Sequence, residues 1–121
     1  MVSVPVAVRQ QVDQWAEAWL GTFSHVLQLR AREPGPFNYP VEVFSQWRGK
    51  ALYLCARYRT PSGRVEDDFV VRQSRMTVTG FGRFDLAYFR HTGRWFTVYR
   101  GLTAAECFSE IEGNELFWPT T

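Results

Sequence analysis

The order of apolar and polar residues predicts a helix near the start of the chain. In residues 4–20, apolar side chains recur at spacings of four, three and four residues, at Val8, Val12, Trp15 and Trp19. This spacing aligns them on one face of an α-helix, and polar residues cover the other side: Gln10, Gln11, Asp13, Gln14 and Glu17. Gly21 follows directly and is typical of the residue that ends a helix. We therefore expect an amphipathic helix that packs on a sheet.

From His25 onward the apolar period changes to two residues, as a half-buried strand requires, and we expect a strand over residues 25–32. Glu33-Pro34-Gly35-Pro36 interrupts it. The later runs are rich in β-branched and aromatic residues, and short turn signals separate them. They cover residues 41–48, 51–59, 65–73, 75–80, 84–90 and 95–100. The sequence thus predicts an antiparallel β-meander of about six to seven strands.

Three turn signals connect these strands: Gly49-Lys50, Pro61-Ser62-Gly63 and His91-Thr92-Gly93. The last two fit a type I turn followed by a glycine in the left-handed region. The first two turns set a register that aligns three sets of residues across three strands: Glu42, Arg57 and Asp67; Phe44, Cys55 and Phe69; and Gln46, Tyr53 and Val71. Both faces of the sheet then carry apolar side chains. We expect the sheet to curl, to be covered by the C-terminal segment, or to bury one face against a second copy.

A capping box predicts a short helix near the C-terminus. In Thr103-Ala104-Ala105-Glu106, the hydroxyl and the carboxylate satisfy free backbone N–H groups of the first turn. The helix would end at Gly113 and turn three apolar side chains inward: Cys107, Phe108 and Ile111. A length of 121 residues suits one compact domain. We therefore expect a single α+β domain over residues 1–121, with an antiparallel sheet between an N-terminal and a C-terminal helix.

Composition limits the classes of function. Hydrophobic residues make up 45% of the chain and charged residues 21%, which is a globular balance, and a net charge of +2 is too small to demand a polyanionic partner. Cys55 and Cys107 form no CxxC pair, so we expect buried free thiols. The sequence shows neither a basic leader nor an apolar segment long enough to span a bilayer. We expect a cytoplasmic protein that holds no cofactor and no metal.

The acidic triplet Glu66-Asp67-Asp68 suggests catalysis or metal binding. Strand alternation points only Glu66 and Asp68 to the same side, so a solvated strand end is the simpler interpretation. The alternative is a small hydrolase or isomerase that acts in a cavity of the curled sheet, with Glu66 or Asp68 as general base. That function requires one of these carboxylates to be buried with a raised pKa. The sequence assigns no catalytic residue.

A second candidate site is basic and aromatic. Arg90, His91 and Arg94 lie at the tip of a predicted hairpin, whose strands carry five aromatic residues: Tyr88, Phe89, Trp95, Phe96 and Tyr99. Arg72, Arg75 and Arg83 are close in sequence. Guanidinium groups bind phosphates, and bases stack on aromatic rings. An alternative function is therefore single-stranded nucleic-acid binding, with Arg90, His91 and Arg94 as the anion site.

We favour a non-catalytic binding or protein-interaction module, because no set of residues in the sequence points to a reaction. The contact surface would be the aromatic face of the sheet or the C-terminal segment, with five interface or pocket residues: Phe44, Tyr53, Phe69, Phe117 and Trp118. Self-association into a homo-oligomer would bury such a face. A small ligand and a partner protein are the other occupants that we consider. Nucleic acid ranks below them, and we expect no membrane partner.

Overall fold

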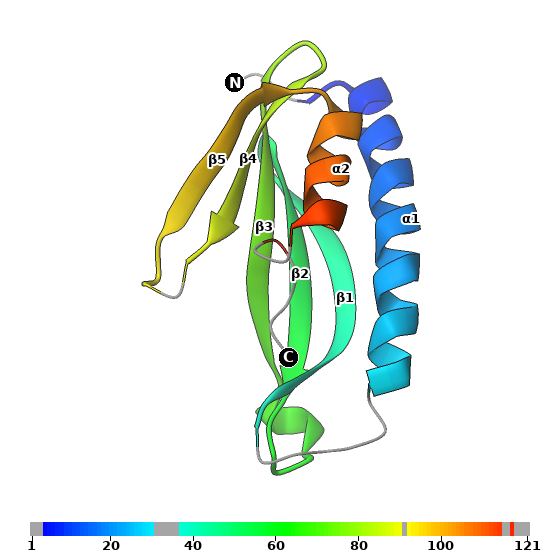
Figure 1. The fold of residues 1–121 in the computed structure, drawn as a ribbon, viewed down its shortest axis with the longest axis vertical. Coiled ribbons are helices and arrows are strands. Elements are labelled where there is room, and N and C mark those ends of the chain that lie inside the picture. Colours follow the sequence, from blue (N-terminus) through cyan, green and yellow to red (C-terminus); the bar gives the residue numbers. More distant parts are fainter. Residues whose placement is uncertain (1–3, 31–36, 91, 115–116, 118–121) are drawn as a thin grey trace.

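Each strand of the sheet pairs with the strand that follows it in the chain, so the five strands form an antiparallel meander in the order β1-β2-β3-β4-β5. The computed structural model describes residues 4–30, 37–90, 92–114 and 117. Its elements are α1 (Val6–Arg30), β1 (Tyr39–Arg48), β2 (Ala51–Arg59), η1 (Val65–Asp67), β3 (Phe69–Gly80), β4 (Arg83–Phe89), β5 (Trp95–Leu102) and α2 (Ala104–Gly113). Both helices lie on the same side of the sheet (Figure 1). The predicted α+β class with a helix at each end is confirmed.

The first helix is longer than the sequence pattern suggests. Helix α1 passes through Gly21 and continues to Arg30, so the predicted strand over residues 25–32 is wrong for residues 25–30. Residues 31–32, and the break at 33–36, lie outside the described residues. The segment that alternates with period two also continues the helical spacing, because Leu20, Phe23 and Leu27 are three and four residues apart. Within the described residues, no helix is long and apolar enough to span a membrane.

The predicted strands 65–73 and 75–80 are one strand, and the described sheet therefore has five strands rather than six to seven. Residues Val65–Asp67 form a 3-10 turn instead of the start of a strand. This turn lengthens the loop, so that Arg57 faces Val70 where we expected Asp67. The β1–β2 register is as predicted, with Glu42 opposite Arg57.

The turns follow the expected chemistry. Gly63 and Gly93 have φ values of 72° and 81°, in the left-handed region that their hairpins require. In the second of these turns, the Gly93 amide donates to the Arg90 carbonyl at 2.9 Å. The glycines of Gly80-Phe81-Gly82 flank the turn between β3 and β4, where Phe81 is 96% exposed.

The core lies between the two helices and one face of the sheet. Alternate residues of β2 point into it, and helix α1 adds one stripe of side chains. The buried members include Val12, Ala16, Trp19, Leu52, Leu54, Ala56, Met76, Phe84, Leu86, Cys107, Phe108, Ile111 and Phe117. Trp15 is at the edge of this stripe and stacks on Phe108, with ring centroids 6.4 Å apart. The two helices are therefore packed on each other as well as on the sheet.

The capping box that the sequence predicts is present at the start of α2. The Glu106 amide donates to the Thr103 hydroxyl at 3.2 Å, and the Thr103 amide donates to the Glu106 carboxylate at 3.0 Å. After the helix, Phe117 is fully buried and its carbonyl accepts a 2.8 Å hydrogen bond from the buried Ser74 hydroxyl. Phe117 thus lies against the sheet and closes the core over β3.

The sheet divides where β4 stops pairing with β3. Strand β3 pairs with β4 from Gly80 to Ser74, whereas residues 69–72 of β3 pair only with β2. The β4–β5 hairpin continues past this point and turns away from β3 (Figure 1). We call the place where they separate the fork, and the β4–β5 hairpin the arm.

Replacing Gly21 with Ala tests the length of α1. Gly21 is exposed inside the helix, and a Cβ atom there meets no other atom within 4 Å. We expect Gly21→Ala to raise the free energy of unfolding by about 0.5–1 kcal/mol, because alanine favours the helix and restricts the unfolded chain. Urea unfolding measures the change. Gly93→Ala, at a positive φ, should destabilise the protein. A destabilising Gly21→Ala would instead mean that the helix ends at Gly21.

Candidate functional site

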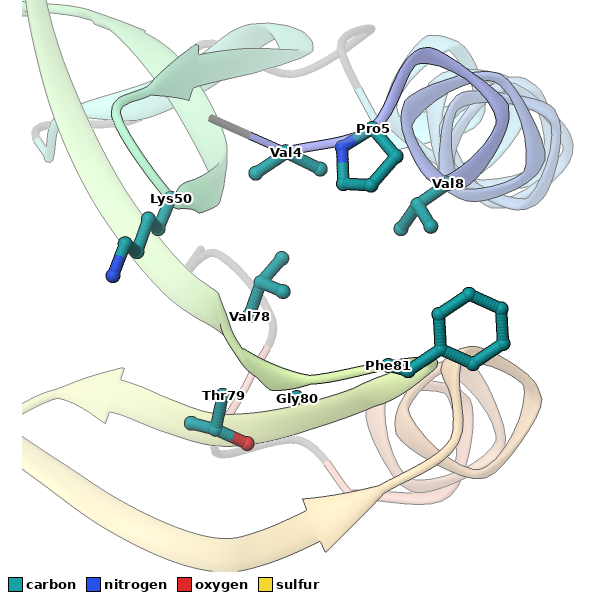
Figure 2. Close-up of a pocket in the computed structure, with 8 residues that line it drawn as sticks. All are labelled: Val4, Pro5, Val8, Lys50, Val78, Thr79, Gly80 and Phe81. Atoms are coloured by element: carbon teal, nitrogen blue, oxygen red, sulfur yellow. The ribbon is translucent and has the colours of Figure 1, made fainter. Parts of the chain in front are cut away.

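A pocket of about 390 Å³ lies between the start of α1 and the turn that joins β3 to β4. Figure 2 shows Val4, Pro5 and Val8 on one side of this pocket and Val78 and Phe81 on the other. Apolar walls supply affinity, but polar groups fix the orientation of a ligand and select it. Because the walls are mostly apolar, this pocket offers few groups that could select a ligand.

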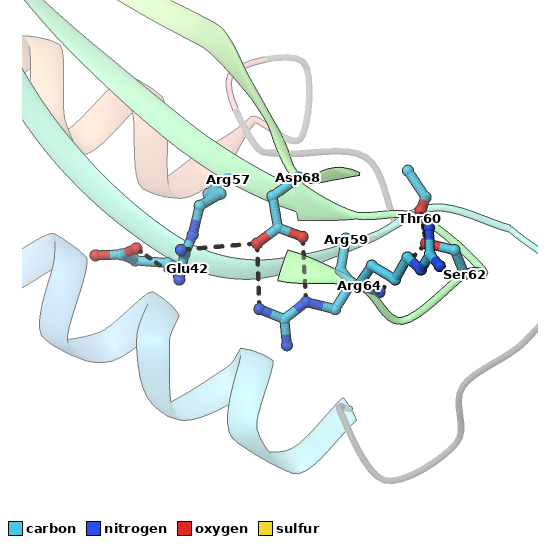
Figure 3. A network of polar contacts seen from close by, with 7 residues as sticks. All are labelled: Glu42, Arg57, Arg59, Thr60, Ser62, Arg64 and Asp68. Carbon is cyan, nitrogen blue, oxygen red and sulfur yellow. Dashed lines mark hydrogen bonds and ion pairs between the residues drawn. The ribbon is translucent and has the colours of Figure 1, made fainter. Parts of the chain in front are cut away.

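A polar network covers the end of β2. Asp68 accepts two hydrogen bonds from Arg59, from Nε and from Nη2, each at 3.1 Å, and Arg57 approaches the same carboxylate at 3.7 Å (Figure 3). Arg57 also pairs with Glu42 at 3.1 Å. The hydrogen bond from Arg59, with the charge of both arginines, holds the pKa of Asp68 below its ordinary value. A general base that acts near neutral pH needs a raised pKa. The pKa of Asp68 is lowered instead, so Asp68 does not meet the requirement of the hydrolase or isomerase hypothesis.

The face of the sheet that neither described helix covers (Figure 1), which we call the uncovered face, carries a group of stacked arginines and rings. We call Tyr53, Arg72, Arg75, Phe89 and Trp95 the arginine–aromatic cluster. The Arg72 guanidinium lies 5.1 Å from the centre of the Tyr53 ring, and that of Arg75 lies 4.7 Å from the centre of the Trp95 ring. Trp95 touches Tyr53 and Phe89 edge to face, at 5.6 and 5.3 Å. These five side chains form one continuous surface.

A β-bulge places both arginines on this face. Arg72 and Arg75 are three residues apart, and simple alternation would send them to opposite faces. The register between β2 and β3 shifts at Leu54 and Cys55, which leaves Gln73 without a partner residue. One extra residue restores the alternation, because a bulge sets two residues against one. The two arginines therefore face the same way.

The charges of the cluster differ from those of the network around Asp68. Among the described residues, no carboxylate lies within 4.0 Å of the guanidinium nitrogens of Arg72 or Arg75. The Nε atom of Arg75 is buried and has no hydrogen-bond partner in the described part of the chain. Arg57 and Arg59, by contrast, share Asp68. The positive charge of the cluster is thus available to a ligand.

A second pocket, of about 420 Å³, occupies the fork. Val70, Val71 and Arg72 line it from β3, and Phe89 and Trp95 line it from the arm. Val70 is 52% exposed and Phe89 37% exposed. Its volume is within the range of ligand pockets, roughly 300–1,000 Å³. The pocket joins exposed apolar side chains to one arginine of the cluster.

The two cysteines are buried and carry no disulfide. Burial raises the pKa of the Cys55 thiol, although the charge of Arg72 acts in the opposite direction. Burial, together with the charges of Glu106, Asp85 and Glu110, raises the pKa of Cys107 to about 12. A nucleophilic or metal-binding cysteine needs a lowered pKa. Within the described residues, no group of three or more His, Cys, Asp and Glu side chains is placed to hold a metal ion.

Of the predicted anion site at the tip of the arm, the structure describes Arg90 and Arg94. The Arg90 guanidinium lies over the Phe96 ring at 4.5 Å, and its strand neighbour Tyr88 points to the core. Arg94 is exposed, and His91 lies outside the described residues. Arg72 and Arg75 make the cluster instead. The sequence shows them only as residues near the hairpin, because the bulge that aligns them leaves no pattern.

The structure describes four of the five predicted interface residues, and they lie in different environments. Tyr53 belongs to the cluster, and Phe44 is on the same face, opposite Cys55 as expected. Phe69 is on the other face, where it stacks on Tyr58 at 5.5 Å, because the register shift of three residues exchanges the faces. Phe117 is part of the core rather than of a contact surface. Trp118 lies outside the described residues.

Comparison with known proteins identifies the family. A model of the family described as Domain of unknown function (DUF3024) matches residues 4–119. This match covers nearly the whole chain, so the chain belongs to this family. No curated protein and no solved structure matches the chain.

Replacing Asp68 with Asn tests the polar network. The carboxylate has a lowered pKa in the folded state, so its contribution is present above its ordinary pKa of 3.8 and is lost as the pH falls through the folded value. We expect Asp68→Asn to lower the free energy of unfolding at pH 7, and this difference from the parent protein to disappear in strong acid. Urea unfolding at several pH values measures it. The exposed Glu66→Gln is the control. A difference that stays constant with pH would contradict the assignment.

Proposed function

We propose that this member of the DUF3024 family is a non-catalytic binding module, and that its binding surface is the uncovered face of the sheet. The observation that carries the proposal is the arginine–aromatic cluster, in which two guanidinium groups are held over rings and have no acidic partner among the described residues. Arginine in this setting presents a planar, permanently charged group to carboxylate or phosphate. Stacking on a ring limits its freedom before a ligand arrives, which reduces the entropy cost of binding.

The charge of the cluster favours an anionic partner over a second copy. Two copies that meet face to face around a two-fold axis bring the same patch of each subunit together. Arg72 and Arg75 of one copy would then approach those of the other, and juxtaposed like charges are costly. We expected a homo-oligomer from the apolar face of the sheet. For the cluster, we therefore propose an anionic partner and not a second copy of the chain.

The cluster also supports a sheet that curls towards its uncovered face. Tyr53 is on β2 and Trp95 is on β5, yet their ring centres are 5.6 Å apart. Between them in the ladder, Tyr53 faces Arg75 and Arg75 faces Ala87. Ala87 carries only a methyl group, and it is buried although it is on the uncovered side. We propose that Trp95 reaches over Ala87 and that the sheet bends around it.

A second candidate function, single-stranded nucleic-acid binding, uses the same surface. The observation in its favour is the alternation of guanidinium planes and rings, because bases stack on both and phosphates pair with guanidinium groups. Such binding weakens steeply with added salt as counterions are released. A short acidic peptide makes fewer ionic contacts, so its binding should fall less steeply.

Chemical-shift mapping with two anionic probes, an oligoglutamate and an oligothymidylate, tests the proposal. We expect at least one probe to shift the amide signals of β2, β3 and β5 around the cluster and to leave those of α1 unchanged. Arg72→Gln and Arg75→Gln should each weaken binding about tenfold, because each removes a charge-assisted hydrogen bond. Arg48→Gln, at an exposed arginine of β1, is the matched control.

Two outcomes would count against the binding surface. In the first, neither probe shifts the amide signals of the parent protein, and light scattering shows a monomer at every concentration. The second is an equal loss of binding in Arg48→Gln, which would indicate a general effect of charge. A dimer that dissociates in Arg72→Gln would mean that the face binds a second copy after all.

A further inference from the structure

The segment of β3 beside the fork has one unpaired edge. Residues 69–72 pair with β2 on one side, and the β3–β4 ladder begins only at Ser74, which faces Tyr88. Within the described residues, no strand pairs with residues 69–73 on the other side, and no hydrogen bond from a turn or loop reaches their backbone. Along such an edge, alternate residues point their N–H and C=O groups outward. This edge can therefore accept another strand where β4 departs.

The outer edges of the sheet have features that protect them. On β1, Pro40 has no N–H to donate, the register breaks between Pro40 and Glu42, and helix α1 packs beside the strand. On β5, the register breaks twice against β4, near the positive φ of Gly101. The β3 edge at the fork instead carries the adjacent β-branched residues Val70 and Val71, with Val70 half exposed. Exposed apolar edges are the ones that add strands.

The fork supplies side-chain contacts on both sides of this edge. Its pocket has β3 residues on one wall and the rings of Phe89 and Trp95 on the other. Arg72 lies on the uncovered side with its charge unpaired among the described residues, and Arg75 follows it beyond the bulge. A strand placed here would find apolar contacts and positive charge together with the free backbone groups.

From these observations, we propose that an acidic, extended segment of a partner protein adds to β3 at the fork as a further strand. This inference rests on the proposed function and specifies how the partner binds. Main-chain hydrogen bonds provide affinity in strand addition, and alternate side chains provide specificity. The acidic side chains of the segment face Arg72 and Arg75, and its apolar side chains enter the fork.

The free backbone edge favours a peptide over a nucleic acid. The peptide chain has N–H and C=O groups at the spacing of a strand, whereas a nucleic acid has no repeating amide to complete the ladder. The rings and arginines of the cluster suit both classes. The edge is the feature that only a polypeptide uses in full.

Short capped peptides test the mode of binding. The probe alternates Glu and Val, so that in a strand all carboxylates are on one face. Two further versions carry backbone N-methyl groups at the odd or at the even positions, which removes alternate main-chain donors and leaves every side chain. We expect the unmethylated peptide to slow amide hydrogen exchange in residues 69–73. One N-methylated version should lose binding by more than tenfold, and the other should retain most of it.

Matched controls separate the contribution of the peptide's charge from that of Arg72. A peptide with Lys in place of each Glu should not bind, and Arg72→Gln should weaken binding of the acidic peptide about tenfold. Arg48→Gln should leave it unchanged. Circular dichroism confirms that both variants remain folded.

Other results would overturn strand addition. Equal binding of both N-methylated peptides would show that only side chains are recognised. In another outcome, oligothymidylate binds the cluster while amide hydrogen exchange in residues 69–73 stays fast. The proposed binding function would then stand, and its ligand would be a nucleic acid instead of a peptide strand. If neither the peptide nor the oligonucleotide perturbs the cluster, both this inference and the proposed function fail.

Discussion

In its pairing with β2, strand β3 contains one residue more than the partner strand can match, and the arrangement of the arginine–aromatic cluster depends on this extra residue. With Gln73 left over, Arg72 falls opposite Cys55 and Arg75 opposite Tyr53, on the same face. A bulge also bends its strand and increases the local twist. The bulge is next to Ser74, where the β3–β4 ladder stops and the arm separates. The same irregularity thus aligns the two cations and lies where the fork opens.

The uncovered face carries two groups of charged side chains. At one end, Asp68 joins Arg57 and Arg59, and the acid and base groups satisfy one another. Near the fork, Arg72 and Arg75 have rings instead of carboxylates as neighbours. Cation–π contacts orient a guanidinium but do not neutralise it. A net charge of +2 for the whole chain therefore understates the charge available at this surface.

Features decided within a few residues could be predicted from the sequence. The cap at Thr103 and the left-handed glycines Gly63 and Gly93 depend on local hydrogen bonding and backbone sterics. Features that depend on distant partners could not. Residues 25–30 fit the spacing of either a helix or a strand, and the 3-10 turn at Val65–Asp67 moved every β2–β3 pair by three or four residues. The candidate site was missed for the same reason, because its arginines share a face only through the bulge.

The stacking of Trp15 on Phe108 ties the two ends of the fold together and sets the order in which the molecule can reach its native state. The hairpins between consecutive strands close short loops, which form quickly. The contact between α1 and α2 closes a loop that contains the whole sheet, and its entropic cost is met only after the meander has made the loop compact. The contact between α1 and α2 therefore forms late, and until it does, part of the apolar face of the meander is open to other chains. Folding of this domain is then a competition between intramolecular docking and aggregation, which a rise in protein concentration shifts towards aggregation.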